Sequence, residues 1–122
     1  MTMFAMLLAL AQAPTHLTIQ PWTGGDFQVT STAAAKYRLE VNGKPNAPVS
    51  LRAVGVAQGW LAAFCTPKLC SPQKIDVHLP GSGQAIFQFE LIREAQNAPK
   101  ESSATIADSD GASVRVPAAY RP

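Results

Sequence analysis

The sequence predicts a single all-β domain, folded as a sandwich or a barrel. Short segments of alternating apolar and polar residues recur along the chain, whereas a sustained helical period is absent. Proline and glycine are frequent, with 10 and 8 residues, and they bound most of these segments. Charged residues make up only 15% of the chain, a balance that favours short strands joined by turns over helices.

The first expected strands lie before residue 47. Residues 16–20 alternate and stop at a proline, and residues 26–30 alternate after a pair of glycines. Residues 37–41 alternate cleanly and lead into residues 42–46, which are dense in turn formers. The Asn42-Gly43 pair there readily adopts the positive φ angles of tight hairpins.

The middle of the chain continues the pattern with strands over residues 49–53, 59–65 and 74–79. A turn over residues 80–83 then precedes the longest expected strand, Ala85–Ile92.

Two faces are expected on that longest strand. Phe87 and Phe89 share one face, and Gln88 and Glu90 lie on the other. Two isoleucines near the strand ends, on the side of Gln88 and Glu90, suggest that this second face is partly covered.

A hairpin is expected to close the domain after a polar loop over residues 94–102. Residues 103–107 and 112–116 flank Asp108-Ser109-Asp110-Gly111, a sequence typical of a hairpin turn. Pro117 is expected to end the last strand and to leave residues 118–122 as a frayed tail. Residues 14–117 then form one domain, long enough for one core.

An apolar, alanine-rich segment opens the chain and predicts an export signal over residues 1–13. Its apolar run of about nine residues suits a signal peptide and is shorter than the roughly 20 that a membrane-spanning helix needs. We expect cleavage after Ala11 or after Ala13, and a secreted or periplasmic protein without a membrane span. Because no Lys or Arg precedes the run, a retained N-terminal strand or helix stays open as an alternative.

The two cysteines, Cys65 and Cys70, are separated by four residues. In an exported protein this pair predicts a structural disulfide that closes a small loop. The alternatives are a redox pair, usually separated by two residues at a helix start, a metal site, and free thiols. A zinc site needs four ligands, and the chain offers only two Cys and two His, so we expect no metal and no cofactor.

The residues between the cysteines are candidate binding residues. Pro67, Lys68 and Leu69 would be held in a closed loop, and such restraint lowers the ordering cost of binding. A narrower form of this hypothesis is an inhibitor-like loop that offers Lys68 to a trypsin-like pocket.

The aromatic residues supply a second candidate surface. Trp22 lies in a turn-rich stretch and either closes one end of the domain or stands exposed as a platform for a sugar ring or a partner. Trp60 is expected in the core or capping its end. A carbohydrate-binding surface would need Trp22, Tyr37 or Trp60 exposed in a row.

Several function classes are disfavoured by composition. The formal net charge is +2 and the basic residues are scattered singly, so we expect no nucleic-acid partner. The acidic residues and the two histidines form no catalytic motif, and we expect no enzyme. The sequence leaves the oligomeric state open.

From residue 58 to residue 116 the order of features resembles the immunoglobulin-like or fibronectin-III-like sandwich domains of exported bacterial proteins. The shared features are Gly59-Trp60, Phe64-Cys65, Cys70-Ser71-Pro72, Leu79-Pro80-Gly81-Ser82-Gly83, the long strand, Ala98-Pro99 and the final hairpin. The resemblance implies a Greek-key sandwich of seven to eight strands, without shared catalytic residues. It also implies a binding, spacing or assembly role with an unknown protein or polysaccharide partner. The long-range disulfide of antibody domains is missing here.

Overall fold

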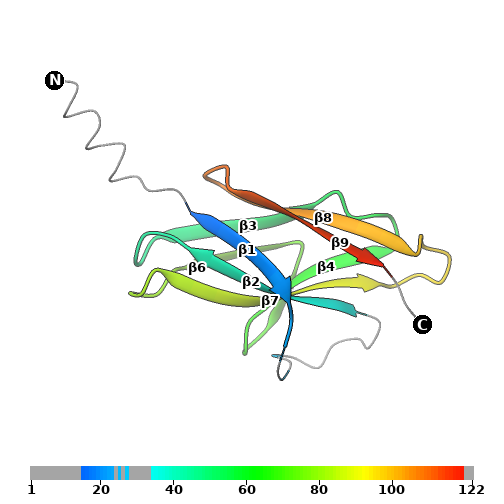
Figure 1. Cartoon of the computed structure of the whole chain (residues 1–122), viewed down its shortest axis with the longest axis horizontal. Coiled ribbons are helices and arrows are strands. Elements are labelled where there is room, and N and C mark those ends of the chain that lie inside the picture. The colour runs from blue at the N-terminus through cyan, green and yellow to red at the C-terminus, as the bar shows by residue number, and fades with distance from the viewer. Residues whose placement is uncertain (1–14, 24, 26, 28–33, 120–122) are drawn as a thin grey trace.

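The computed structural model describes residues 15–23, 25, 27 and 34–119 (Figure 1). The expected signal segment 1–13, the strand expected over residues 26–30 apart from Phe27, and residues 120–122 lie outside this description. The strands of the described part are β1 His16–Pro21, β2 Ala34–Asn42, β3 Pro48–Val54, β4 Trp60–Cys65, β5 Cys70–Pro72, β6 Lys74–His78, β7 Gln84–Arg93, β8 Glu101–Asp108 and β9 Ser113–Ala119.

The strands form two antiparallel sheets, so the predicted all-β sandwich is confirmed. One sheet has five strands in the order β1-β2-β7-β4-β5, and the other has four in the order β6-β3-β8-β9. The chain crosses from one sheet to the other after β2, β3, β5, β6 and β7. The strand count exceeds the expected seven to eight partly because the three-residue β5 completes a hairpin with β4.

The core lies between the two sheets and consists of side chains from alternate strand positions. Strand β3 shows this most clearly, because its residues from Pro48 to Val54 alternate between exposed and buried. The largest buried side chains include Phe64 and Phe89, whose ring centroids lie 5.1 Å apart. Burying each such side chain contributes about 1.5–3 kcal/mol to folding.

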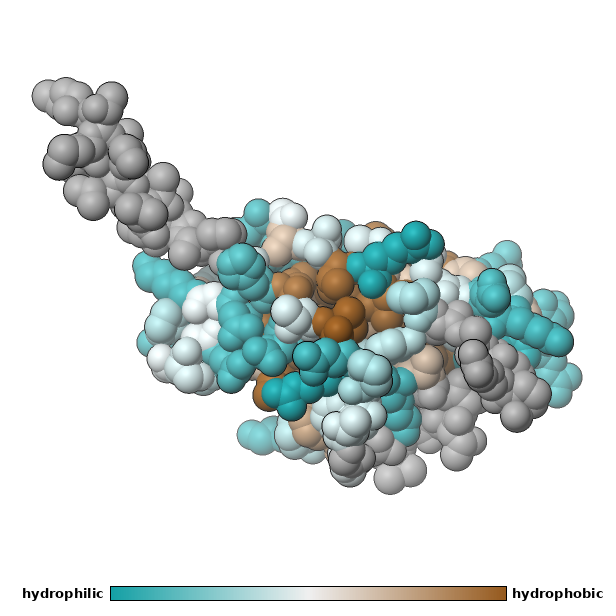
Figure 2. Space-filling model, in the orientation of Figure 1, coloured by the Kyte–Doolittle hydropathy of each residue, from teal (hydrophilic) through white to brown (hydrophobic). Residues whose placement is uncertain are grey.

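Apolar side chains also gather in the middle of the face on which β1 and β9 lie, with polar residues around them (Figure 2). The two strands contact each other across the open side of the sandwich. Leu17 and Ile19 of β1 and Val114 of β9 are partly buried against the core. None of the described residues forms a helix long and apolar enough to cross a membrane.

Strand β9 continues past Pro117, which was expected to end it, and pairs with β8 as far as Ala119. The proline is tolerated because β9 is the edge strand of its sheet. On the outer side of an edge strand there is no neighbouring strand that needs a hydrogen bond from the missing N–H.

Candidate functional site

The predicted disulfide between Cys65 and Cys70 is confirmed. The two residues lie directly opposite each other at the end of the β4–β5 pairing, which continues through Phe64 opposite Ser71. The disulfide therefore closes the hairpin at the position where the strands separate.

The residues between the cysteines, Thr66 to Leu69, form what we call the hairpin tip. The Thr66 amide donates to the Leu69 carbonyl oxygen at 2.7 Å. The Thr66 hydroxyl donates to the same carbonyl, and its oxygen accepts from the amides of Lys68 and Leu69, each at 3.2 Å. The Thr66 hydroxyl thus bonds three backbone groups of the turn. The hairpin tip is therefore held by these hydrogen bonds as well as by the disulfide.

The predicted binding residues Pro67, Lys68 and Leu69 are all exposed at this tip. Leu69 is 52% exposed and Val54 is 48% exposed, and these are the exposed large hydrophobic residues of the described part. Val54 ends β3, in the other sheet. The hairpin tip therefore combines an exposed leucine, a lysine and a proline on a rigid turn.

Two buried polar side chains lie on β7 beside the disulfide end of the hairpin. Gln88 and Glu90 of β7 have no exposed surface, although they point away from the face that carries Phe89. In the register of β4 and β7, Gln88 lies opposite Cys65 and Glu90 opposite Ala63. Both therefore lie on the outer face of the five-stranded sheet, the face that points away from the other sheet.

The other predicted binding residue, Trp22, lies half-buried and packs edge-to-face on Phe27, with ring centroids 4.8 Å apart. Its amide donates to the Lys36 carbonyl oxygen, and the Phe27 amide donates to Oε1 of Gln88 at 2.8 Å. Phe27 thus lies against the outer face of the five-stranded sheet. The Trp22 indole N–H has no acceptor among the described residues.

The three aromatic residues considered for sugar binding do not form an exposed row. Trp60 is buried, as expected, and its indole N–H donates to the Pro99 carbonyl oxygen at 2.7 Å. Tyr37 packs on the core, and its hydroxyl donates to the Pro117 carbonyl oxygen, which joins the two sheets. Burial raises the pKa of Tyr37.

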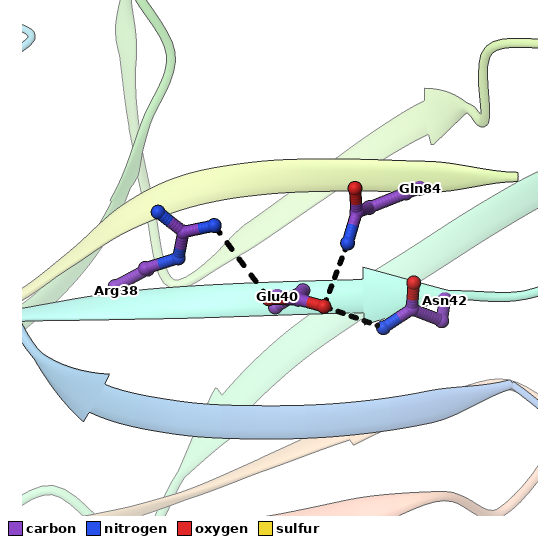
Figure 3. Close-up of polar contacts among 4 residues, drawn as sticks. All are labelled: Arg38, Glu40, Asn42 and Gln84. Atoms are coloured by element: carbon purple, nitrogen blue, oxygen red, sulfur yellow. Dashed lines mark hydrogen bonds and ion pairs between the residues drawn. The ribbon is translucent and has the colours of Figure 1, made fainter. Parts of the chain in front are cut away.

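A polar network surrounds Glu40 of β2 (Figure 3). The amides of Asn42 and Gln84 donate to Oε1 of Glu40 at 3.1 and 2.6 Å, and the Arg38 guanidinium lies 3.6 Å from its other oxygen. These contacts, led by the Asn42 hydrogen bond, lower the pKa of Glu40 because they favour the ionised carboxylate. Within this network the Glu40 carboxylate is paired with the Arg38 guanidinium, and the Gln84 hydrogen bond links β7 to β2.

A hollow of about 400 Å³ lies over β3, β6 and the start of the β8–β9 turn. Strand pairing places Arg52 opposite Lys74 there, a pair of cations that are far apart in the sequence. Asp76 and Asp108 also line the hollow. The two carboxylates offset the two cations, so the hollow has no net charge with which to select an ion.

Gln88 and Glu90 of β7 lie beside the disulfide, and the sequence analysis did not place either residue in a candidate site. The isoleucines flanking Gln88 and Glu90 indicated that their face is partly covered, and the burial of both residues confirms this. No local pattern indicated that this covered face adjoins the cysteines, because that contact depends on β4 pairing with β7.

Comparison with known proteins identifies a fold and no family. No family model and no curated protein matches the chain. Among solved structures, the chain is similar to a FixG-related protein from Vibrio parahaemolyticus, with a TM-score of 0.51 and 14% sequence identity. The match covers 88% of this chain and 95% of that one. At this identity the likeness concerns the fold alone.

Proposed function

We propose that the protein is a non-catalytic, exported binding module of the immunoglobulin-like or fibronectin-III-like type, and that it engages a protein partner through the hairpin tip. The observation that carries the proposal is the exposure of Pro67, Lys68 and Leu69 on a turn closed by a disulfide. An exposed apolar side chain on a turn that is already ordered can bind a partner at a low cost in conformational entropy.

The chemistry of the tip indicates the kind of surface it fits. Leu69 would fill an apolar pocket, and the Lys68 ammonium would pair with a carboxylate at the rim of that pocket. Because the turn is already ordered by Thr66 and by the disulfide, binding costs little conformational entropy.

Export is part of this proposal, and the disulfide supports it because disulfides persist in oxidising compartments. The intact mass of the protein recovered from outside the cytoplasm tests this part. A mass that starts at Gln12 or Pro14, with thiols alkylated only after reduction, is the expected result. A full-length mass with freely alkylated thiols would contradict it.

The binding surface is tested by placing a photo-crosslinking amino acid at position 69 in the producing cells. The matched control carries the same amino acid at position 54, because Val54 is similarly exposed but lies in the other sheet. We expect a discrete crosslinked protein from position 69 and none from position 54. Lys68→Glu in the position-69 protein should weaken the crosslink.

Equal crosslinking from both positions, or none from position 69, would overturn this surface. So would a crosslink that Lys68→Glu leaves unchanged.

A further inference from the structure

Three potential metal ligands meet beside the turn of the β4–β5 hairpin, and we propose that the protein, once its disulfide is reduced, binds a zinc-type divalent cation through Cys65, Cys70 and Glu90. The two sulfur atoms and one carboxylate oxygen of Glu90 all lie within 4.8 Å of one another. This inference is independent of the partner proposed for the hairpin tip.

The fold places the three side chains on one face from three adjacent strands. Cys70 of β5 lies opposite Cys65 of β4, and β4 pairs with β7 on its other side. Cys65 lies opposite Gln88, so Glu90 is its diagonal neighbour on the outer face of the five-stranded sheet. In this position Oε2 of Glu90 lies 3.8 Å from Sγ of Cys65.

That contact contributes little while the disulfide is intact. A disulfide sulfur carries no hydrogen, so it cannot donate to the carboxylate. Glu90 and Cys65 are both fully buried, so an electrostatic contact between them is only weakly screened by solvent. A thiol or a metal–thiolate group in place of the disulfide would add a direct interaction with Cys65 to those that the Glu90 carboxylate already makes.

Reduction requires an external reductant, and the geometry indicates which sulfur a dithiol would attack. Cys70 is half-buried, whereas Cys65 has no exposed surface. A thiolate of the reductant therefore attacks Sγ of Cys70, the S–S bond breaks, and Cys65 leaves as a thiolate. The second thiol of the reductant then displaces Cys70, so the reductant is oxidised to a disulfide and supplies two electrons and two protons.

A cation would stabilise the product of this reduction. Two thiolates and the carboxylate carry a formal charge of −3. Lys36 lies opposite Glu90 on the neighbouring strand and carries +1, so a divalent cation brings the local sum to zero. Binding the cation releases the two thiol protons.

The ligand set selects the class of metal. Thiolates favour soft or borderline ions such as Zn²⁺ over Mg²⁺ or Ca²⁺, and zinc accepts a mixture of sulfur and carboxylate ligands. Three protein ligands leave a fourth position, which water reaches past the half-buried Cys70.

The test is a Zn²⁺ titration of the protein reduced with a phosphine, with the oxidised protein as control. Competition with a chromophoric chelator gives the affinity, and Cd²⁺ reports thiolate coordination by its near-ultraviolet charge-transfer absorption. We expect one Zn²⁺ per chain for the reduced protein and none for the oxidised protein. Zn²⁺ should also raise the thermal unfolding midpoint of the reduced protein.

The role of the carboxylate is tested with Glu90→Gln, matched by Glu94→Gln at an exposed position just after the end of β7, away from the cysteines. Glu90→Gln should weaken Zn²⁺ binding at least about tenfold, and Glu94→Gln should not change it. If Glu90→Gln fails to fold, Glu90→Asp replaces it with the same expectation, because it retracts the carboxylate by one methylene.

Three results would each overturn the proposal. One is the absence of stoichiometric Zn²⁺ binding by the reduced wild-type protein. Another is unchanged affinity in the Glu90 variant. The third is a reduced chain that loses its β-sheet circular dichroism and does not regain it with Zn²⁺.

Discussion

Replacing Gly83 by alanine should destabilise the sandwich more than replacing either of two other turn glycines. Gly83 is the last turn residue before β7 and has a φ of +77°. A Cβ atom at this position would lie 2.5 Å from the carbonyl oxygen of Gly43. The two residues are also joined by a hydrogen bond from the Gly43 amide to the Gly83 carbonyl oxygen at 2.8 Å.

The expected cost follows from two contributions and one offset. A non-glycine residue in the left-handed region costs about 1–2 kcal/mol. Relieving an overlap in a packed site costs about 1–3 kcal/mol, and here the overlapped atom is backbone and cannot rotate away. Alanine also restricts the unfolded chain, which returns about 0.4–1 kcal/mol. The net loss in the free energy of unfolding is about 3 kcal/mol, or a fall of about 15 °C in the unfolding midpoint.

Two further variants separate these contributions. Gly111 has a φ of +95° but no atom within 4 Å of its Cβ position, so Gly111→Ala should cost only about 1 kcal/mol. Gly81 has neither a positive φ nor a close neighbour, so Gly81→Ala should stay within about 0.5 kcal/mol of wild type. Urea unfolding followed by tryptophan fluorescence measures all three. A Gly83→Ala cost no larger than that of Gly111→Ala would refute the steric argument.

Gln84→Ala should raise the pKa of Glu40 toward its ordinary value, because it removes a donor to the ionised carboxylate, and a ¹³C NMR titration of the carboxyl group measures this. Because the folded pKa lies below the unfolded value, the stabilising contribution is complete above about pH 4.5 and is lost as the pH falls through the folded pKa. Wild type should therefore lose more stability than Glu40→Gln over that acid range, and parallel losses would contradict this. Tyr37→Phe should cost about 1 kcal/mol by removing the hydroxyl bond to the Pro117 carbonyl oxygen, and thermal unfolding of the variant tests this. A Tyr37→Phe variant as stable as wild type would show that this bond between the sheets is energetically neutral.

Local patterns in the sequence predicted most of the strands that the structure describes, although β5 and the end of β9 were not predicted. The strand predicted over residues 74–79 is found as β6, and Ile75 is buried there whereas His78 is exposed. The disulfide between Cys65 and Cys70 was also predicted, because they are the two cysteines of the chain and lie close together in the sequence. These features depend on the period of side chains along one strand or on chain proximity, and both can be read from neighbouring residues.

Only the tertiary structure decided which strands became neighbours. The order β2-β7-β4 in one sheet brings Glu90 next to Cys65, and the pairing of β3 with β6 brings Arg52 opposite Lys74. Both contacts join residues from strands that are not adjacent in the sequence, and their register is set by how two complete hydrophobic faces pack. The sequence by itself therefore determined that the chain forms a disulfide-closed β sandwich, whereas the packing of its sheets decided which polar groups meet the disulfide.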